Sequence, residues 1–227
     1  MIVVIASSYD DVARTIVAHW GNECAALLTA EDLCRPGWSL SVPATLSGTA
    51  VIAGQIVSTA DITGILTLRS SIWPQELSNI TLTDRSYVSA ELNAFLLAWL
   101  KERTCPIINR PSASCLAGPN WRAEQWTQAA ARLDIPVRAC ERHVPCHLSR
   151  EKEEETAQVT VAGERCFGHS NPTFSSWALQ LARASGTDLL SAYFSLAEGC
   201  FLTANPWPHL SDPSILTAVK ERLEGKL

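Results

Sequence analysis

The first 28 residues of this 227-residue chain follow a strand, helix and strand pattern. Residues 2–6 are a run of β-favouring side chains that ends in small ones. Residues 10–20 carry apolar side chains at helical spacing and end before a Gly-Asn pair, and residues 25–28 are apolar again. Two parallel strands need a crossover between them, which is usually a helix. The opening therefore predicts a parallel sheet in an α/β fold.

The segment up to residue 133 continues the pattern. Residues 64–68 have the composition of a strand, and the alternation in residues 38–57 indicates short, partly exposed strands. No glycine-rich phosphate loop follows the first strand, which argues against a dinucleotide site there. A long helix is predicted at residues 84–103, a strand with a polar, rigid end at 106–111, and a helix at 123–133. The long helix has one apolar face, made of Val88, Leu92, Phe95, Leu96 and Trp99.

The last third of the chain has antiparallel character. Residues 159–167 predict a hairpin with its turn at Gly163, and a helix is predicted at residues 174–185. Two further strands are predicted at residues 189–196 and 201–204, joined through a Glu-Gly turn. The second of them is cut off by the sequence Asn205-Pro206-Trp207-Pro208, and a final helix is predicted at 213–223.

Composition excludes several kinds of partner. The net charge is −5 and no basic stripe is present, so nucleic acid is not expected. No apolar run reaches about 18 residues, so no membrane helix is expected. The apolar start lacks basic residues and indicates a strand, not a signal peptide, and eight cysteines without such a signal favour reduced thiols in the cytoplasm. Only 18% of residues are charged, which indicates either a surface covered by another chain or a large core.

The order of elements resembles a known enzyme superfamily. Residues 1–138, with Asn109-Arg110-Pro111 and the sequence Leu-Asp-Ile-Pro-Val at 133–137, resemble the pre-ATP-grasp domain of ATP-grasp enzymes that modify ribosomal peptides. The hairpin at 159–167 and the strand pair at 189–204 resemble the second lobe of an ATP-grasp domain. The resemblance implies a flavodoxin-like parallel sheet domain at 1–138, followed by a reduced ATP-grasp-like α+β part at 139–227.

The residues that ATP-grasp chemistry requires are missing. These enzymes form an acyl phosphate with ATP and magnesium, and the resemblance implies a Glu, an Asp and an Arg at positions held here by Thr203, Tyr193 and Gln158. A neutral threonine cannot replace a carboxylate as counter-charge to magnesium. A lysine is also expected near Trp121 and Ala123, where only an arginine follows Trp121. In the family a nucleotide-binding sub-domain occupies the place of residues 138–158.

The sequence therefore predicts a catalytically silent binding or scaffold protein, either a homo-oligomer or the accessory subunit of a ligase. It would hold a peptide or a small carboxylated molecule in the old cleft and need no cofactor. The alternative is a small, atypical ATP-dependent carboxylate–amine ligase. Acidic residues near the last hairpin, Asp188, Glu198 and Asp212, do not occupy the required positions. The residues expected to line the cleft are Asn109, Arg110, Asn205 and Trp207.

A cluster of cysteines and histidines offers a second hypothesis. Six such residues fall within a short stretch, and mixed Cys/His sets suit tetrahedral zinc, which could staple the shortened segment. Their spacing matches no zinc-finger pattern, so a chance cluster in a cysteine-rich chain stays open. A cysteine nucleophile with His147 or His169 as base is a further alternative without an identified orienting group. The six residues are Cys140, His143, Cys146, His147, Cys166 and His169.

Overall fold

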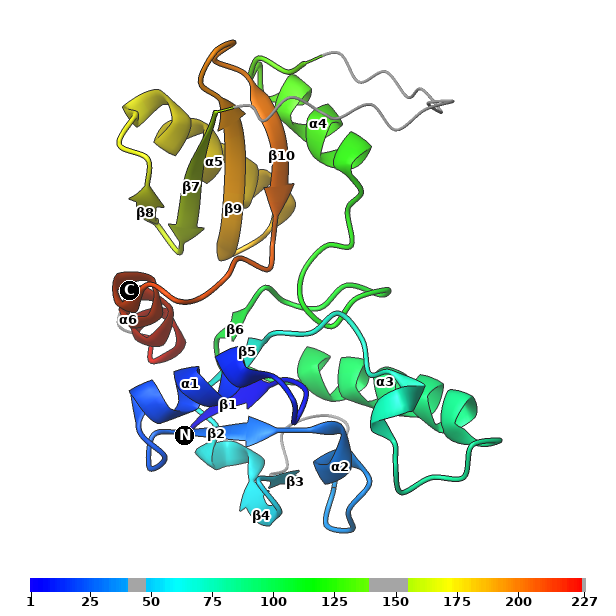
Figure 1. Ribbon diagram of the computed structural model, residues 1–227. Helices are drawn as coiled ribbons and strands as arrows, with labels where there is room; N and C mark the ends of the chain where they lie inside the picture. The colour runs from blue at the N-terminus through cyan, green and yellow to red at the C-terminus, as the bar shows by residue number, and fades with distance from the viewer. Residues whose placement is uncertain (41–47, 139–154, 226–227) are drawn as a thin grey trace. The chain divides into compact units, whose positions relative to one another are not determined.

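The described chain forms two compact units, shown with their elements in Figure 1. The computed structural model describes residues 1–40, 48–138 and 155–225. One unit consists of residues 1–120 with 209–227, and the other of residues 121–208. The domain boundary predicted between residues 138 and 139 comes from the resemblance of each part to a different domain of ATP-grasp enzymes. Division of the chain into compact units does not test that resemblance, so the boundary stays a prediction.

The first unit is built on a parallel sheet with the strand order β2-β1-β5-β6. The central β1 pairs in parallel with β2 and with β5, so the predicted α/β class is confirmed. This is the order of a doubly wound, flavodoxin-like sheet in which β3 and β4 form a separate hairpin. The elements are β1 (Ile2–Ile5), α1 (Asp11–Trp20), β2 (Ala25–Leu28), α2 (Ala30–Leu33), β3 (Thr49–Ile52), β4 (Gln55–Ser58), the 3₁₀ turns η1 (Thr59–Asp61) and η2 (Pro74–Glu76), β5 (Gly64–Thr67), α3 (Arg85–Lys101), β6 (Ile107–Ile108) and α6 (Pro213–Leu223).

Local sequence sets the ends of α1. The Asp10 side chain accepts a hydrogen bond from the Ala13 N–H at 3.0 Å, which satisfies a donor that the helix itself leaves unpaired. Gly21 ends the helix at φ +90°, a conformation that residues with a Cβ rarely adopt.

The β3–β4 hairpin turns through Ala53 and Gly54, both at positive φ, as two-residue hairpin turns require. The Gly54 N–H donates to the Asp32 carboxylate at 2.8 Å, which links the hairpin to α2. The strands predicted in residues 38–57 are confirmed here, although only β4 is exposed and β3 is largely buried. Residues 41–47 lie outside the described residues.

The long helix α3 covers one face of the parallel sheet. Leu96 and Trp99 are fully buried in a core that also contains Val3, Ile5 and Ile65, which alternate along their strands. The predicted apolar face of the helix is therefore confirmed, and its remaining members are partly buried against the same core: Val88, Leu92 and Phe95.

The strand β6 is much shorter than the 106–111 segment predicted as a strand. It holds only Ile107 and Ile108. Asn109 follows at φ +53° and is 2% exposed, so the extended backbone ends there in a buried left-handed residue. Pro111 cannot donate to a strand partner, which prevents the ladder from resuming. The chain therefore turns back immediately after two residues.

A buried ion pair fastens the carboxyl ends of β1 and β5. The guanidinium of Arg69, which lies just after β5, pairs with Glu76 of η2. It also donates to the carbonyl oxygens of Ala6 at 3.3 Å and Ser71 at 3.0 Å. A buried cation needs such compensation, so the role of Arg69 is structural.

The last helix, α6, returns to the first unit and contacts β5 and β6. The Lys220 ammonium donates to the Trp20 carbonyl at 3.2 Å, which links α6 to α1. Gly64 of β5 lies so close to the end of α6 that a Cβ atom built on it would be 2.6 Å from the Leu223 carbonyl oxygen. The absence of a side chain at this position lets the helix approach the strand.

The second unit is an antiparallel sheet with the order β10-β9-β7-β8. The predicted turn at Gly163 (φ +62°) is confirmed, as is the hairpin through Gly199, whose N–H donates to the Ser195 carbonyl at 2.9 Å. The elements are α4 (Ala123–Arg132), β7 (Thr156–Ala162), β8 (Arg165–Gly168), α5 (Pro172–Ser185), β9 (Leu189–Ser195) and β10 (Phe201–Asn205).

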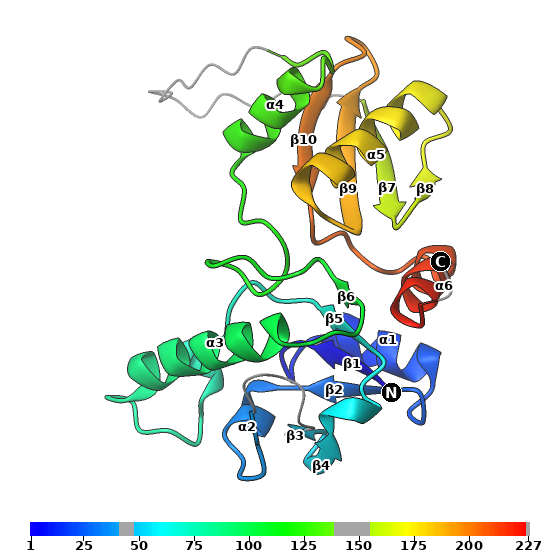
Figure 2. The same ribbon diagram turned by 180° about the vertical axis from the view of Figure 1, so that it is seen from behind.

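Helices α4 and α5 pack on one face of this sheet. Figure 2 shows α5 in front of the strands, and in Figure 1 it lies behind them. Phe174 of α5 stacks on Phe194 of β9 with ring centroids 4.6 Å apart, and Trp126 of α4 is buried in the same core. The opposite face of the sheet therefore carries the alternate residues of each strand.

Among the helices of the described chain, none has the length and apolar character that crossing a membrane requires.

We expect Gly64→Ala to lower the free energy of unfolding by about 1–3 kcal/mol, because the added methyl group forces the end of α6 away from β5. Chemical denaturation followed by circular dichroism measures this loss. The control is the same substitution in a chain that ends at Arg222, which lacks the clashing Leu223 carbonyl. An equal loss in both backgrounds would contradict the explanation.

Candidate functional site

Three residues that the resemblance places in the nucleotide site lie in one row across the second sheet. Gln158 of β7 and Thr203 of β10 both pair with Tyr193 of β9. Ala157 and Val159, which flank Gln158 in β7, belong to the core under the helices. Side chains alternate along a strand, so Gln158 lies on the opposite face. The register thus gathers these three positions on the polar face of the sheet, the face opposite α4 and α5.

The next row contains hydroxyl groups that bond to one another. Thr160 and Ser191 are paired across β7 and β9, and their hydroxyl oxygens lie 2.6 Å apart. The Gln158 amide donates to the Ser191 hydroxyl at 3.2 Å and to the Thr160 hydroxyl at 3.4 Å. Both hydroxyl residues are buried, so these bonds satisfy groups that would otherwise be costly. This cluster was not predicted from the sequence. Its signal is the alternation of polar side chains with apolar core side chains along β7 and β9.

The acidic residues near the hairpin have other partners. Glu198 pairs with Arg138 at 2.9 Å at the exposed turn between β9 and β10. Asp212 caps α6 by accepting hydrogen bonds from the Ser214 hydroxyl and from the Ser214 N–H at 2.8 Å, and these two bonds hold the pKa of Asp212 below its ordinary value. The Asp188 carbonyl accepts from the Gly163 N–H at 2.7 Å. Neither of the two described rows of the polar face contains a carboxylate.

Asn205 and Trp207 shape the loop that ends β10. The side-chain Oδ1 of Asn205 accepts from the Trp207 N–H at 2.9 Å, and the side-chain Nδ2 donates to the Trp207 backbone carbonyl at 3.0 Å. The amide of Asn205 is therefore engaged with the backbone, which is a structural role. Trp207 stays 38% exposed and offers an aromatic surface.

Asn109 and Arg110 lie in a compact loop of the first unit. Asn109 is buried, and Gly118 (φ +80°) approaches it so closely that a Cβ there would be 3.2 Å from the Asn109 Cβ. The loop closes on itself through the backbone bonds of Ser112 and Cys115, at 2.9 and 3.4 Å. Arg110, the residue after Asn109 in this loop, is exposed.

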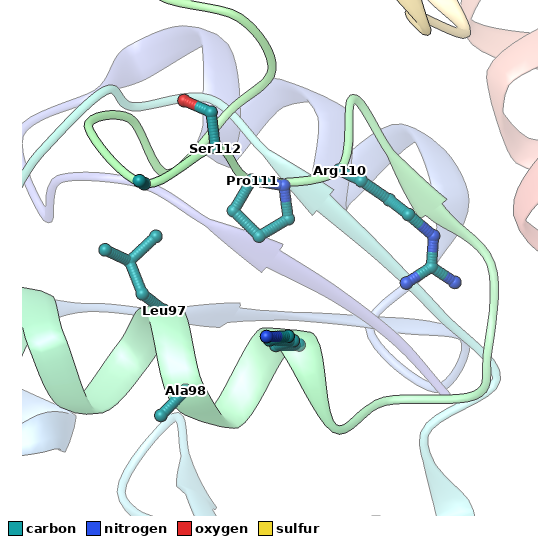
Figure 3. Close-up of a pocket in the computed structure, with 7 residues that line it drawn as sticks. Leu97, Ala98, Arg110, Pro111 and Ser112 are labelled. Atoms are coloured by element: carbon teal, nitrogen blue, oxygen red, sulfur yellow. The ribbon is translucent and has the colours of Figure 1, made fainter.

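A cavity of about 380 Å³ lies between this loop and the end of α3 (Figure 3). In Figure 3, Leu97 points from the helix toward the loop, and the Arg110 side chain extends from the loop toward the helix. Lys101, the last residue of α3, was not anticipated as part of a site. The lining residues are Leu97, Ala98, Lys101, Arg110, Pro111, Ser112 and Ala113.

The expected cleft joins residues of both units. Asn109 and Arg110 belong to the first unit, whereas Asn205 and Trp207 belong to the second. The cleft as a whole therefore stays a prediction. The structure does show that Arg110 lines a cavity within its own unit.

Four members of the expected zinc cluster, Cys140, His143, Cys146 and His147, lie outside the described residues. The two described members have partners within the chain: the Cys166 thiol lies 3.6 Å from the Ser175 carbonyl, and His169 Nδ1 accepts from the Asn171 N–H at 3.2 Å. Within residues 1–40, 48–138 and 155–225, no three His, Cys, Asp or Glu side chains are grouped as a metal site requires. Zinc binding stays a prediction.

Cys166 has a thiol that resists ionisation. Burial raises the pKa of the thiol above its ordinary value, and the nearby Glu164 carboxylate adds to this effect, while the hydrogen bond to Ser175 opposes it. Because the thiolate is the reactive form of a nucleophilic cysteine, these surroundings disfavour a nucleophilic role at neutral pH.

Comparison with solved structures finds the same fold. The macrocyclase MdnC of Microcystis aeruginosa MRC, bound with precursor peptide MdnA, matches with a TM-score of 0.70 at 10% identity over 98% of this chain and 98% of that chain. A RiPP-associated ATP-grasp ligase of Chryseobacterium gregarium, in complex with ADP and a leader and core peptide, matches at 0.68 and 10% identity over 100% and 97%. The ATP-grasp ligase PsnB, complexed with a minimal precursor, matches at 0.68 and 12% over 97% and 98%.

The chain therefore has an ATP-grasp-like fold, and its architecture is that of ATP-grasp ligases associated with peptide modification. The resemblance stated from the sequence is confirmed at the level of the fold. No protein-family model and no curated protein matches the sequence. At 10–12% identity the matches carry the fold alone, so function must be argued from the residues of this chain.

We expect Cys166 to be alkylated by iodoacetamide only at higher pH in the native chain than in the chain unfolded in guanidinium. The raised pKa keeps more of the native thiol protonated at any given pH. Mass spectrometry of the tryptic peptide across a pH series measures both profiles, with and without a chelator. Faster native alkylation at neutral pH would show an activated thiolate and contradict this assignment.

Proposed function

We propose that this chain is an ATP-grasp-like protein that binds a peptide or a small carboxylated ligand and does not ligate it. The observation that carries the proposal is the neutral row Gln158–Tyr193–Thr203 on the polar face of the second sheet. Magnesium needs hard oxygen ligands, usually one or two carboxylates, to offset its charge. A glutamine, a tyrosine and a threonine supply no such counter-charge.

The hydrogen bonds beside that row support the same reading. Gln158 is engaged with the Thr160 and Ser191 hydroxyls, which together form a closed polar group. A residue used to bind phosphate has to present a cation or a free donor to solvent. On this face the polar groups stabilise the sheet itself, in agreement with a surface no longer used for nucleotide chemistry.

Peptide binding is supported by the solved structures of the same fold. The solved structure of MdnC is bound with precursor peptide MdnA, that of PsnB is complexed with a minimal precursor, and that of the Chryseobacterium ligase contains a leader and core peptide. A chain that keeps the fold but has neutral side chains at the nucleotide positions could retain the ability to hold a peptide. It would then serve as a scaffold or as the accessory subunit of a separate ligase.

Oligomer formation is part of the proposal. Only 18% of the residues are charged, and several large apolar side chains of the first unit are exposed, among them Tyr9 at 80% and Leu82 at 80%. Exposed apolar surface favours association with another chain.

The six described cysteines are free thiols, which suits a reducing compartment such as the cytoplasm.

The alternative is a small, atypical carboxylate–amine ligase. The fold itself favours it, since the structures that match are those of ligases. Against it stand the neutral row and the use of Asn205 in its own turn.

We expect isothermal titration of the full chain with ATP and magnesium to give no binding at micromolar nucleotide, because the two described rows of the polar face contain no carboxylate for the metal. PsnB, whose structure has been solved with magnesium and ADP, is the positive control. A micromolar dissociation constant, or ADP formation in the presence of peptide, would favour the ligase alternative.

We expect light scattering to find the chain larger than 24.7 kDa in solution, because its exposed apolar side chains favour association. Tyr9→Ser and Leu82→Ser test which surface is involved. A monomer at all concentrations would remove the homo-oligomer from the proposal and leave the partner subunit.

A further inference from the structure

The cavity between the end of α3 and the loop after β6 combines apolar walls with two cations. Leu97 and Ala98 of α3 and Pro111 of the loop form the apolar part, and Lys101 and Arg110 supply positive charge. Its volume of about 380 Å³ lies at the small end of the range for ligand sites, about 300–1,000 Å³. A site of this size accommodates the end of a chain better than a whole nucleotide.

Arg110 and Lys101 differ from several other cations of the described chain, which have partners. Arg69 is paired with Glu76, Arg183 with Glu164, and the Arg103 guanidinium lies 5.3 Å from the Trp99 ring. Within the described residues, neither Arg110 nor Lys101 has an ion pair or a hydrogen bond from its side chain. The cavity therefore carries positive charge that no residue within 1–40, 48–138 and 155–225 neutralises.

The loop is organised before any ligand arrives. Buried Asn109 fixes the chain before Arg110, and Pro111 restricts it afterwards. The Ser112–Cys115 bonds close the turn, and the Leu116 N–H donates to the Ser70 carbonyl at 2.9 Å. A preorganised site loses less conformational freedom on binding.

The local electrostatics favour a single negative charge over a phosphate group. Phosphate sites usually use a helix N-terminus, whose dipole is positive. This cavity lies at the C-terminal end of α3, where the negative end of the dipole opposes any anion and opposes a doubly charged phosphate more than a singly charged carboxylate, and its lining residues include no glycine. A carboxylate needs only the two cations, and arginine can bind it with two parallel hydrogen bonds.

We propose that this cavity binds the C-terminal carboxylate of a peptide whose last residue is apolar. A terminal residue carries its carboxylate and its side chain on one Cα, so both can reach neighbouring surfaces. The carboxylate pairs with Arg110 and Lys101, and the side chain packs on Leu97 and Pro111. The inference rests on the proposed function, because it names the ligand class that the binding protein takes.

The test is a titration of the ¹⁵N-labelled full chain with N-acetyl-leucine, observed by NMR. We expect shifts of the Leu97, Ala98 and Ala113 amides and of the Arg110 side chain, with a dissociation constant of about 1 mM for a ligand of this size. N-acetyl-leucine amide, which lacks the charge, binds at least about tenfold more weakly.

Variants assign the effect to the charge. Arg110→Gln weakens binding of the acid about tenfold, and Arg110→Lys weakens it less because the charge remains. Arg14→Gln is the matched control: Arg14 pairs with Asp11 on the exposed face of α1, outside the cavity, and its loss leaves binding unchanged. Arg110 is exposed, so its variants are expected to fold, and the dispersion of the NMR spectrum verifies this.

The inference is wrong if N-acetyl-leucine and its amide bind with equal affinity, or if Arg110→Gln leaves the affinity for the acid unchanged. It is also wrong if ADP or inorganic phosphate binds the same residues more tightly than the acid does. Absence of any chemical-shift change up to about 10 mM acid, tenfold above the expected dissociation constant, would overturn it as well. The titration with ATP and magnesium separates this failure from that of the proposed function. Micromolar ATP binding refutes the silent-protein proposal, whereas a silent cavity without ATP binding refutes only the carboxylate site.

Discussion

The antiparallel register of β9 with its two neighbours is the constraint on which the functional reading depends. It places Gln158, Tyr193 and Thr203 side by side on the polar face of the second sheet. A shift of one residue would send each side chain to the helix-covered face, where Phe174 and Phe194 are stacked. The aromatic core therefore fixes which residues face outward. The chemistry of that face follows from the packing of the opposite one.

Hydrogen bonding then determines what the polar residues can do. Thr160 and Ser191 are buried and satisfy each other, and Asn205 uses its amide on the Trp207 backbone. Groups committed in this way stabilise the fold and are not available to a ligand without a loss of those bonds. Arg69 follows the same logic in the first unit, where Glu76 compensates its buried charge. The cavity cations differ because no described residue neutralises them.

Much of the fold could be predicted from local pattern. Residues 10–20, 84–103 and 213–223 form helices close to their predicted bounds because apolar spacing is a local signal, and the first and last of them also have side-chain caps, Asp10 and Asp212. The strand at 106–111 was overestimated, since the left-handed conformation of Asn109 depends on its burial. The assignment of α6 to the first unit was not anticipated either, because contacts between β5 and residues far along the chain leave no local signature.

The sequence alone determined the α/β class, the ATP-grasp-like order of elements and the neutral side chains at positions where the resemblance implies charge. The α/β class follows from periodicity, which needs no knowledge of distant contacts. The ATP-grasp-like order, and the positions at which charge is expected, are what the resemblance implies, and the neutral side chains there are read directly from the sequence. Only the tertiary structure decided that Gln158, Tyr193 and Thr203 form one row, that the Thr160 and Ser191 hydroxyls meet, and that Lys101 joins Arg110 at a cavity. Strand register and loop closure bring together residues from separate elements, and no local pattern in the chain records those distances.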